Sequence, residues 1–105
     1  MPSGFRPMIP QIYAAEDSRV TPPVTINQTL PLYPTRPVPN GQGVLEVVID
    51  ESGTVESAAI RQSVNSLYDR LALAATKTWR YRPATVNGVP VKFRKSILIT
   101  LSPRD

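Results

Sequence analysis

The sequence predicts an α+β domain in which a three-stranded antiparallel sheet is packed by one main helix, in the order β-β-α-β. Three observations predict it. Two apolar runs flank a glycine-containing turn at 50–53, a stretch of helix length follows, and the turn signal Asn87-Gly88 comes before a last alternating run. With 105 residues the chain has room for one small domain.

The amino-terminal part is expected to be extended. Nine of the twelve prolines lie in the first 39 residues, and each removes a backbone donor and disfavours helix before it. We predict a flexible lead-in over residues 1–18 and a proline-rich extended segment over 19–42. Valine, isoleucine and leucine at even positions from 20 to 32 make one side of that segment apolar. It is therefore expected to pack on the domain as an added strand, or to cross to a second copy in a dimer.

The domain itself is predicted over residues 43–102 and begins with a hairpin. In "GVLEVVIDESGTVESAAI" Gly53 provides the positive φ that a tight turn needs. Leu45, Val47 and Ile49 should face the core, and this nearly continuous apolar run suits a middle strand. The more polar run over 54–62 suits an edge.

The stretch "NSLYDRLALAATKTW" predicts the helix. Ser66 followed by Asp69 is typical of a helix start. A broad face is expected on the sheet, bordered by Tyr68, Ala72 and Trp79. Its residues are Leu67, Leu71, Ala74, Ala75 and Thr78. Since Pro83 cannot continue a helix, the predicted end is near Arg80.

The closing run alternates apolar and polar residues from Val91 to Leu101, except that Lys95 falls on the apolar face. The pattern implies either a bulge there or a position that the sheet does not bury. Because the helix returns along the sheet, this last strand becomes an edge with free backbone donors and acceptors. Trp79, the one tryptophan, is expected on the last helical turn, closing the end of the core.

Composition excludes several functions. The chain has neither cysteine nor histidine, so thiolate chemistry, the commonest general base and the commonest metal ligands are absent. The carboxylates at 46–56 are explained by exposed strand and turn positions, and no phosphate-binding glycine loop is present. We therefore predict no enzyme activity, no catalytic residue, no metal and no cofactor.

Charge is distributed unevenly along the chain. Residues 1–69 carry four basic and seven acidic side chains, whereas residues 70–105 carry eight basic and one acidic. A basic carboxy-terminal third fits nucleic acid, anionic lipid, an acidic protein segment or simply a solvated face. Single-stranded nucleic acid is one alternative, because Trp79, Tyr81 and Phe93 alternate with arginine and lysine, although only Tyr81 is expected to be free for stacking.

The residues also resemble a known family, the carboxy-terminal domain of TonB and its relatives. The resemblance covers residues 24–101 and includes Pro31, Tyr33 and Pro34, then "GQGVLEVVIDESGTV" with Gly53, and then a serine near the end of the second strand. It ends with "WRYRP" and the closing strand. The motif residues in that last element are Trp79, Arg80, Tyr81 and Pro83.

The resemblance implies a periplasmic protein–protein interaction module of an energy transducer. Its last strand would bind the TonB box, a short segment of an outer-membrane transporter, by β-augmentation. The implied accepting residues are Lys92, Phe93, Arg94, Lys95, Ser96, Ile97 and Leu98. Such transducers have an inner-membrane anchor, so the chain is expected to be an excised domain. A structural or self-associating envelope module, including a homodimer, is the alternative, and residues 19–32 are a candidate occupant of the edge.

Overall fold

The computed structural model describes residues 11–103, so residues 1–10 of the predicted lead-in lie outside the described part. No helix within 11–103 is long and apolar enough to cross a membrane. The elements, in chain order, are β1 Ile12–Ala14, β2 Val20–Thr21, β3 Val24–Asn27, β4 Gly41–Ile49, β5 Val55–Gln62, α1 Ser66–Ala75, the 3-10 helix η1 Thr76–Thr78, β6 Arg80–Arg82, β7 Ala84–Val86 and β8 Val89–Leu101.

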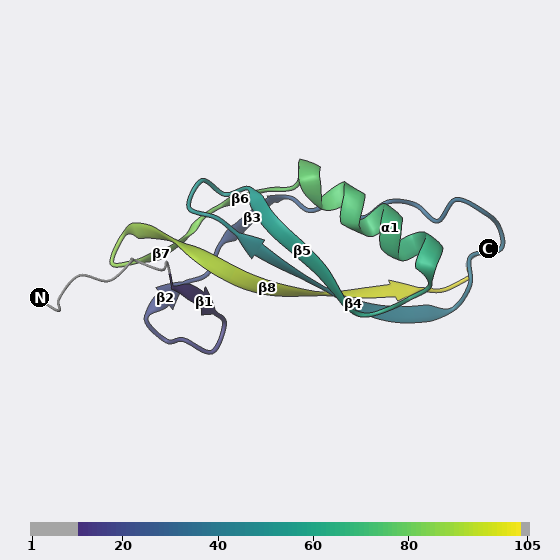
Figure 1. The fold of residues 1–105 in the computed structure, drawn as a ribbon, viewed down its shortest axis with the longest axis horizontal. Helices are drawn as coiled ribbons and strands as arrows, with labels where there is room; N and C mark the ends of the chain where they lie inside the picture. The colour runs from purple at the N-terminus through teal and green to yellow at the C-terminus, as the bar shows by residue number, and fades with distance from the viewer. Residues whose placement is uncertain (1–10, 104–105) are drawn as a thin grey trace, which may run out of the picture.

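Six strands form one sheet in the order β2-β7-β8-β4-β5, with β1 beside β8, while β3 and β6 form a separate two-stranded ribbon (Figure 1). The neighbours are antiparallel except for β1 and β8, which are parallel. The α+β class and the central position of β4 between β5 and β8 are as predicted. The prediction of only three strands is wrong, because short pairings of two to four residues extend the sheet and build the ribbon.

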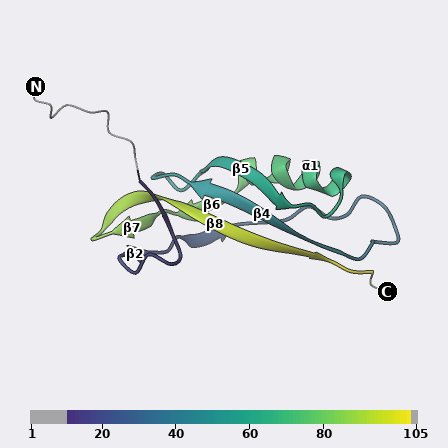
Figure 2. The same ribbon diagram turned by 60° about the horizontal axis from the view of Figure 1, so that its bottom comes forward.

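The main core lies on one face of the sheet, here called the inner face. Leu45, Val47 and Ile49 of β4 are fully buried there. The helix α1 and the β3–β6 ribbon cover this face, and β8 runs along the whole length of the molecule (Figure 2). The other buried core residues are Tyr68, Ala72, Trp79, Tyr81, Ile97 and Ile99.

Trp79 is fully buried in this core, but it does not belong to the helix. Residues 76–78 tighten into a 3-10 turn, and Trp79 then takes an extended conformation with φ −72° and ψ 147°. The predicted helix end near Arg80 is therefore wrong, and Arg80 starts β6. The indole Nε1 donates to the Thr29 carbonyl oxygen at 2.9 Å, so the proline-rich segment provides the partner that a buried indole needs.

The core side of the helix is rotated away from the centre of the predicted face, toward two residues that were expected at its border. Its buried residues are Tyr68 and Ala72, followed by Thr76 just beyond its end, whereas Ala74 is exposed. The N-cap is Asn65 rather than Ser66, and the Asn65 side chain accepts a hydrogen bond from the Tyr68 amide at 2.8 Å. Tyr68 can be buried because its hydroxyl donates to the Pro31 carbonyl oxygen at 2.6 Å.

A second, smaller core joins the amino-terminal strands to β7 and β8. Val20 of β2, Ala84 of β7 and Phe93 of β8 are buried together, with Tyr13 of β1 packed against them. Residues 12–14 and 20–21 are therefore part of the sheet, and Leu30 and Tyr33 pack on the main core. Only part of the apolar stripe of the proline-rich segment packs on the domain, since Val24, Ile26 and Leu32 stay exposed.

Gly53 allows the β4–β5 turn to approach β6 closely. Its φ is +87°, and its carbonyl oxygen accepts a hydrogen bond from the Tyr81 amide at 2.9 Å. A Cβ atom at this position would collide with the Tyr81 carbonyl, whereas Gly88, with φ +80°, has open space around it. Both glycines sit in the turns that the sequence predicted, and only Gly53 is also restricted by a neighbour.

We expect Gly53→Ala to destabilise the domain far more than Gly88→Ala. Both substitutions force alanine into the left-handed region, which costs about 1 kcal/mol, but only Gly53→Ala also pushes β6 away, for a total of about 3 kcal/mol. Urea denaturation of the two variants measures the difference. Equal losses of unfolding free energy in the two variants would mean that the contact between the turn and β6 contributes nothing to stability.

Candidate functional site: the outer edge of the last strand

The candidate site is the side of β8 that faces away from β4. On its β4 side, β8 is paired continuously from Phe93 to Leu101. On the other side it is paired in two short stretches, 89–91 with β7 and 92–94 with β1. Within residues 11–103 no strand pairs with that side of 95–101. Alternate backbone amides and carbonyls over seven residues are therefore free to bind an extended chain.

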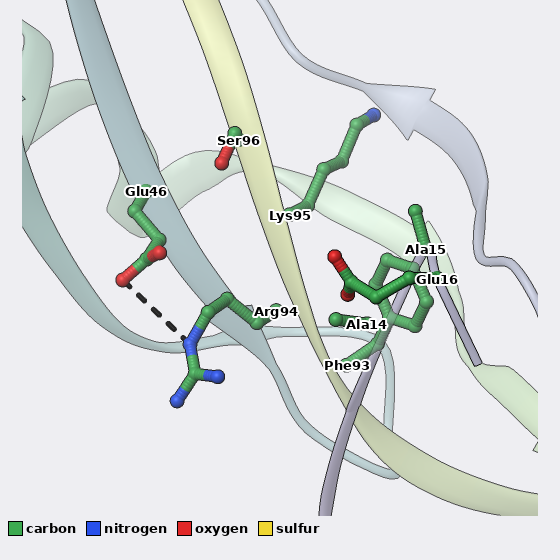
Figure 3. A pocket seen from close by; sticks show the side chains of 8 residues that line it. All are labelled: Ala14, Ala15, Glu16, Glu46, Phe93, Arg94, Lys95 and Ser96. Carbon is green, nitrogen blue, oxygen red and sulfur yellow. Dashed lines mark ion pairs between the residues drawn. The ribbon is translucent and has the colours of Figure 1, made fainter.

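One end of this open edge meets a hollow of about 390 Å³, where β1 ends and turns away (Figure 3). Arg94, Lys95 and Ser96 line it from β8, while Ala14 and Glu16 line it from the amino-terminal segment. In Figure 3 the chain after β1 lies directly beside β8 at this point. The amino-terminal segment thus limits how far the open edge extends toward Phe93.

The other end meets a hollow of about 310 Å³ between the proline-rich segment and the end of β8. No charged side chain lines it; its walls include Leu30, Leu32, Tyr33 and Leu101. Tyr33 stacks on Tyr68 with ring centroids 5.9 Å apart and so fixes the wall in place. The open edge therefore runs from a charged hollow to an uncharged one.

Lys95 points to the inner face, and neither explanation predicted for it is complete. The register of β4 and β8 is unbroken at this residue, so there is no bulge. Its ammonium group donates to Gln28 Oε1 at 2.7 Å and to Thr25 Oγ1 at 3.1 Å, and it lies 5.0 Å from the centroid of the Tyr81 ring. Burial lowers the pKa of Lys95. Lys95 thus connects β8 to the segment beneath it and is not available as a free surface cation.

Burial raises the pKa of Tyr81 to about 12. The Tyr81 hydroxyl donates to Gln28 Oε1 at 2.6 Å, so one amide oxygen accepts from both Tyr81 and Lys95. The expectation that Tyr81 stays free is wrong, because its side chain is only 3% exposed.

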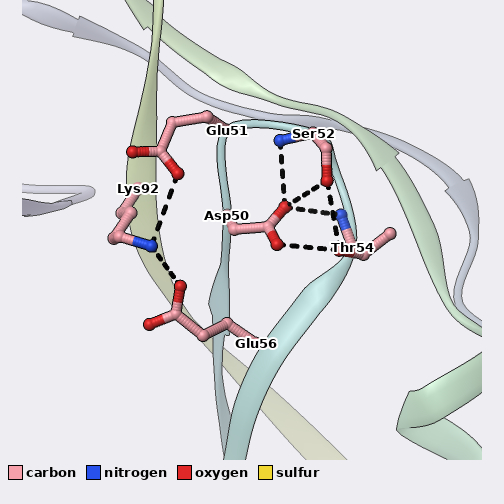
Figure 4. Close-up of polar contacts among 6 residues, drawn as sticks. All are labelled: Asp50, Glu51, Ser52, Thr54, Glu56 and Lys92. Carbon is pink, nitrogen blue, oxygen red and sulfur yellow. Dashed lines mark hydrogen bonds and ion pairs between the residues drawn. The ribbon is translucent and has the colours of Figure 1, made fainter.

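The other two cations of the strand face the opposite side and are paired with acids. Lys92 Nζ contacts the carboxylates of Glu51 and Glu56 (Figure 4). Arg94 Nε lies 3.7 Å from Glu46 Oε1, which also accepts from Arg61. The hydrogen bond to Glu56 is the main reason that the pKa of Lys92 is raised. The basic character of "KFRK" is therefore largely balanced within the sheet itself.

The turn after β4 holds these acids in place. Asp50 accepts hydrogen bonds from the backbone amides and hydroxyls of both Ser52 and Thr54, at 2.7 to 3.1 Å (Figure 4). Burial acts to raise the pKa of Asp50, but these four bonds outweigh it and lower the pKa to about 2. Because the turn is fixed by Asp50, Glu51 and Glu56 reach Lys92 from either side.

All seven predicted accepting residues lie on β8, but they are not equivalent. The edge at Lys92, Phe93 and Arg94 is already paired with β1, and the Phe93 side chain is buried. The edge at the other four, Lys95 to Leu98, is open. The occupant of the edge is β1, not the segment 19–32 that was the predicted candidate.

The sequence prediction missed three residues of the open edge and the strand that covers its start. Ile99, Thr100 and Leu101 continue the alternating pattern of the last strand, and that pattern was the signal that they belong to the same edge. The only signal for β1 was a three-residue run, Ile12-Tyr13-Ala14, in a region without periodicity. Residues 11–103 contain no cluster of three or more potential metal ligands.

Comparison with known proteins gives one family and one fold. The family model described as Gram-negative bacterial TonB protein C-terminal matches residues 31–100. Among curated proteins no match was found. The solution NMR structure of the Pseudomonas aeruginosa TonB carboxy-terminal domain is similar, with a TM-score of 0.56 and 22% sequence identity over 88% of this chain and 96% of that chain. At that identity the structural likeness establishes the fold.

We expect the contribution of Asp50 to stability to disappear in acid. The folded-state pKa is about 2 against a usual value of 3.8, so the contribution is complete above pH 4 and is lost as pH falls toward 2. Asp50→Asn should cost about 1 kcal/mol at pH 7, since the turn is partly solvated. Urea denaturation at several pH values measures the free energies of unfolding of Asp50→Asn and the parent chain. Their difference should disappear in acid.

A matched control is Asp17→Asn, because Asp17 also has a pKa of about 2, but its partner is the exposed guanidinium group of Arg19. We expect it to change stability less than Asp50→Asn at pH 7. If the free energy of unfolding of Asp50→Asn differed from that of the parent chain by the same amount at pH 7 and at pH 2, the stabilisation could not be assigned to the ionised Asp50 carboxylate.

Proposed function

The chain belongs to the TonB C-terminal domain family, and from that premise we propose that it binds the TonB box of an outer-membrane transporter as a strand added to the open edge of β8. Domains of this family are periplasmic, non-catalytic parts of energy transducers. In this proposal the domain works in the periplasm and is connected to an inner-membrane anchor through a longer protein.

The observation that carries the proposal is the unpaired side of β8 at 95–101. An extended peptide can form main-chain hydrogen bonds there, and these supply affinity with little dependence on sequence. The side chains beside the edge then supply selectivity: Leu98, which is 64% exposed, on the outer face, and the uncharged hollow near Leu101 at one end.

The edge is well suited to a partner and poorly protected against one. Edge strands usually carry free charges, prolines or bulges that prevent pairing. Between 95 and 101 the only charged residue is Lys95, and its ammonium group is engaged on the inner face. Pro90 is in the stretch that β7 already covers. A long edge without such protection supports a role in strand addition.

The structure disfavours single-stranded nucleic acid as the partner. The aromatic rings that would stack with bases, Trp79, Tyr81 and Phe93, are each 3% exposed or less. The cations Lys92 and Arg94 beside the edge are paired with carboxylates. Self-association through the same edge is the second candidate, because an open strand edge pairs with any suitable strand, including that of a second copy.

We expect a synthetic TonB-box peptide to protect backbone amides of β8 within 95–101. Hydrogen exchange followed by NMR should show slowing on alternate residues, because only every second amide faces the partner. A peptide with proline at its centre is the matched control, since it lacks one donor and resists the extended ladder. Molecular mass should be measured in the same buffer.

Protection that falls on β5, the opposite edge of the sheet, would overturn this assignment. Uniform protection of 95–101 in a dimer without peptide would favour self-association instead. The same samples therefore separate the two candidates.

We also expect peptide affinity to depend only weakly on salt. Main-chain hydrogen bonds and apolar contacts dominate the proposed interface, so affinity should change by less than about threefold between 50 and 200 mM salt, whereas binding to phosphates changes it by orders of magnitude. Fluorescence anisotropy of a labelled peptide, with an oligonucleotide as comparison, measures both dependences. A steep fall for the peptide would contradict the proposed interface.

A further inference from the structure

We infer that β1 is a removable occupant of the binding edge, which the partner strand displaces in order to pair with the full stretch 92–98. This inference rests on the proposed function of β8 and concerns how access to that site is controlled.

The overlap is direct. Ile12, Tyr13 and Ala14 pair with Lys92, Phe93 and Arg94, which are three of the seven residues expected to accept a partner. Beyond Ala14 the chain stays close, since Ala15 and Glu16 line the same hollow as Lys95 and Ser96 (Figure 3).

A partner strand that leaves β1 in place is therefore confined to 95–101. A longer strand must take the place of β1. A longer strand forms more main-chain hydrogen bonds with the edge, so displacement of β1 gives the partner a gain in affinity.

The pairing of β1 is weak for a strand of this sheet. It has three residue pairs, and it is parallel, an arrangement slightly less stable per residue than the antiparallel one. All three residues of β1 are only half-buried, whereas β8 contains several buried residues on its β4-paired part. Only Tyr13 adds a large side chain to the second core.

The chain after β1 is held in place by different contacts. Val20 is 8% exposed, packs against Ala84 and Phe93, and pairs with Val86 of β7. Between the two strands lies a turn in which the Asp17 amide donates to the Ala14 carbonyl at 3.0 Å. When β1 leaves the edge, β2 therefore keeps it nearby.

A tethered strand competes at a high effective concentration. The edge then selects partners that bind better than Ile12-Tyr13-Ala14 does. Since Tyr13 covers Phe93, a successful partner places an apolar or aromatic side chain at the same register.

The test uses a disulfide between β1 and β8. Ala14 and Arg94 are direct partners in the register, and neighbouring strands lie about 4.8 Å apart, within the range that a disulfide spans. The sequence has no cysteine, so the double variant Ala14→Cys, Arg94→Cys forms a single bond. The oxidised form keeps β1 on the edge, and the reduced form of the same protein is the matched control.

Binding of the same TonB-box peptide is measured in both forms by anisotropy and amide exchange. We expect the oxidised form to bind about tenfold more weakly, with protection confined to 95–101, because the contacts at 92–94 are closed to the peptide. In the reduced form protection should extend to Lys92. Circular dichroism and a thermal melt confirm that both forms are folded.

A second variant tests the inference without a disulfide. Tyr13→Ser removes the side chain that β1 packs on the second core, so amides at 92–94 should exchange faster in the free protein and peptide affinity should rise several-fold. Tyr13→Phe keeps the packing and is expected to behave like the parent chain.

Equal affinity and an equal footprint in the oxidised and reduced forms would overturn the inference and leave the proposed function standing. Peptide binding in neither form, nor in Tyr13→Ser, would overturn the proposed function, and with it the inference. Failure of the two proposals is thus distinguished within one set of samples.

Discussion

Three hydrogen bonds from buried aromatic side chains determine how the main core and the proline-rich segment of this domain fit together. Trp79 donates to the Thr29 carbonyl, Tyr68 to the Pro31 carbonyl and Tyr81 to the Gln28 side chain. A buried indole or phenol without a partner would be costly, and here each partner lies within four residues of an extended segment. The core and the proline-rich segment therefore stabilise each other.

This constraint also explains how the edge of β8 stays open. Once the segment is fixed beneath the sheet, Gln28 and Thr25 are in reach of the Lys95 ammonium group, which turns inward. The remaining cations of that strand find carboxylates on the hairpin and on β4. The strand is thereby left with unpaired backbone groups and little free charge at 95–101, a combination that favours addition of another strand.

The central part of the fold was predictable from sequence because each element there has a strong local signal. Gly53 and Asn87-Gly88 mark turns with positive φ, and the apolar run of β4 identifies the middle strand. The short strands were not predictable, because two to four residues show no periodicity and their pairing depends on distant partners. The position of Lys95 could not be foreseen either, since its explanation lies about 70 residues earlier, at Thr25 and Gln28. The face of the helix that packs on the core was not predicted correctly, because alanines at 72, 74 and 75 place small apolar side chains around most of the helix.

The order of the strands has a mechanical consequence. Among the described elements β1 is the first along the chain, and it is held by three residue pairs, whereas β2, the next strand, places Val20 in the second core. A pull applied to residue 11 from its amino-terminal side would load β1 before any other element, and β1 would yield first. Tension would then uncover the start of the β8 edge while the rest of the domain stayed folded, so that load on the chain would lengthen the surface available to a partner.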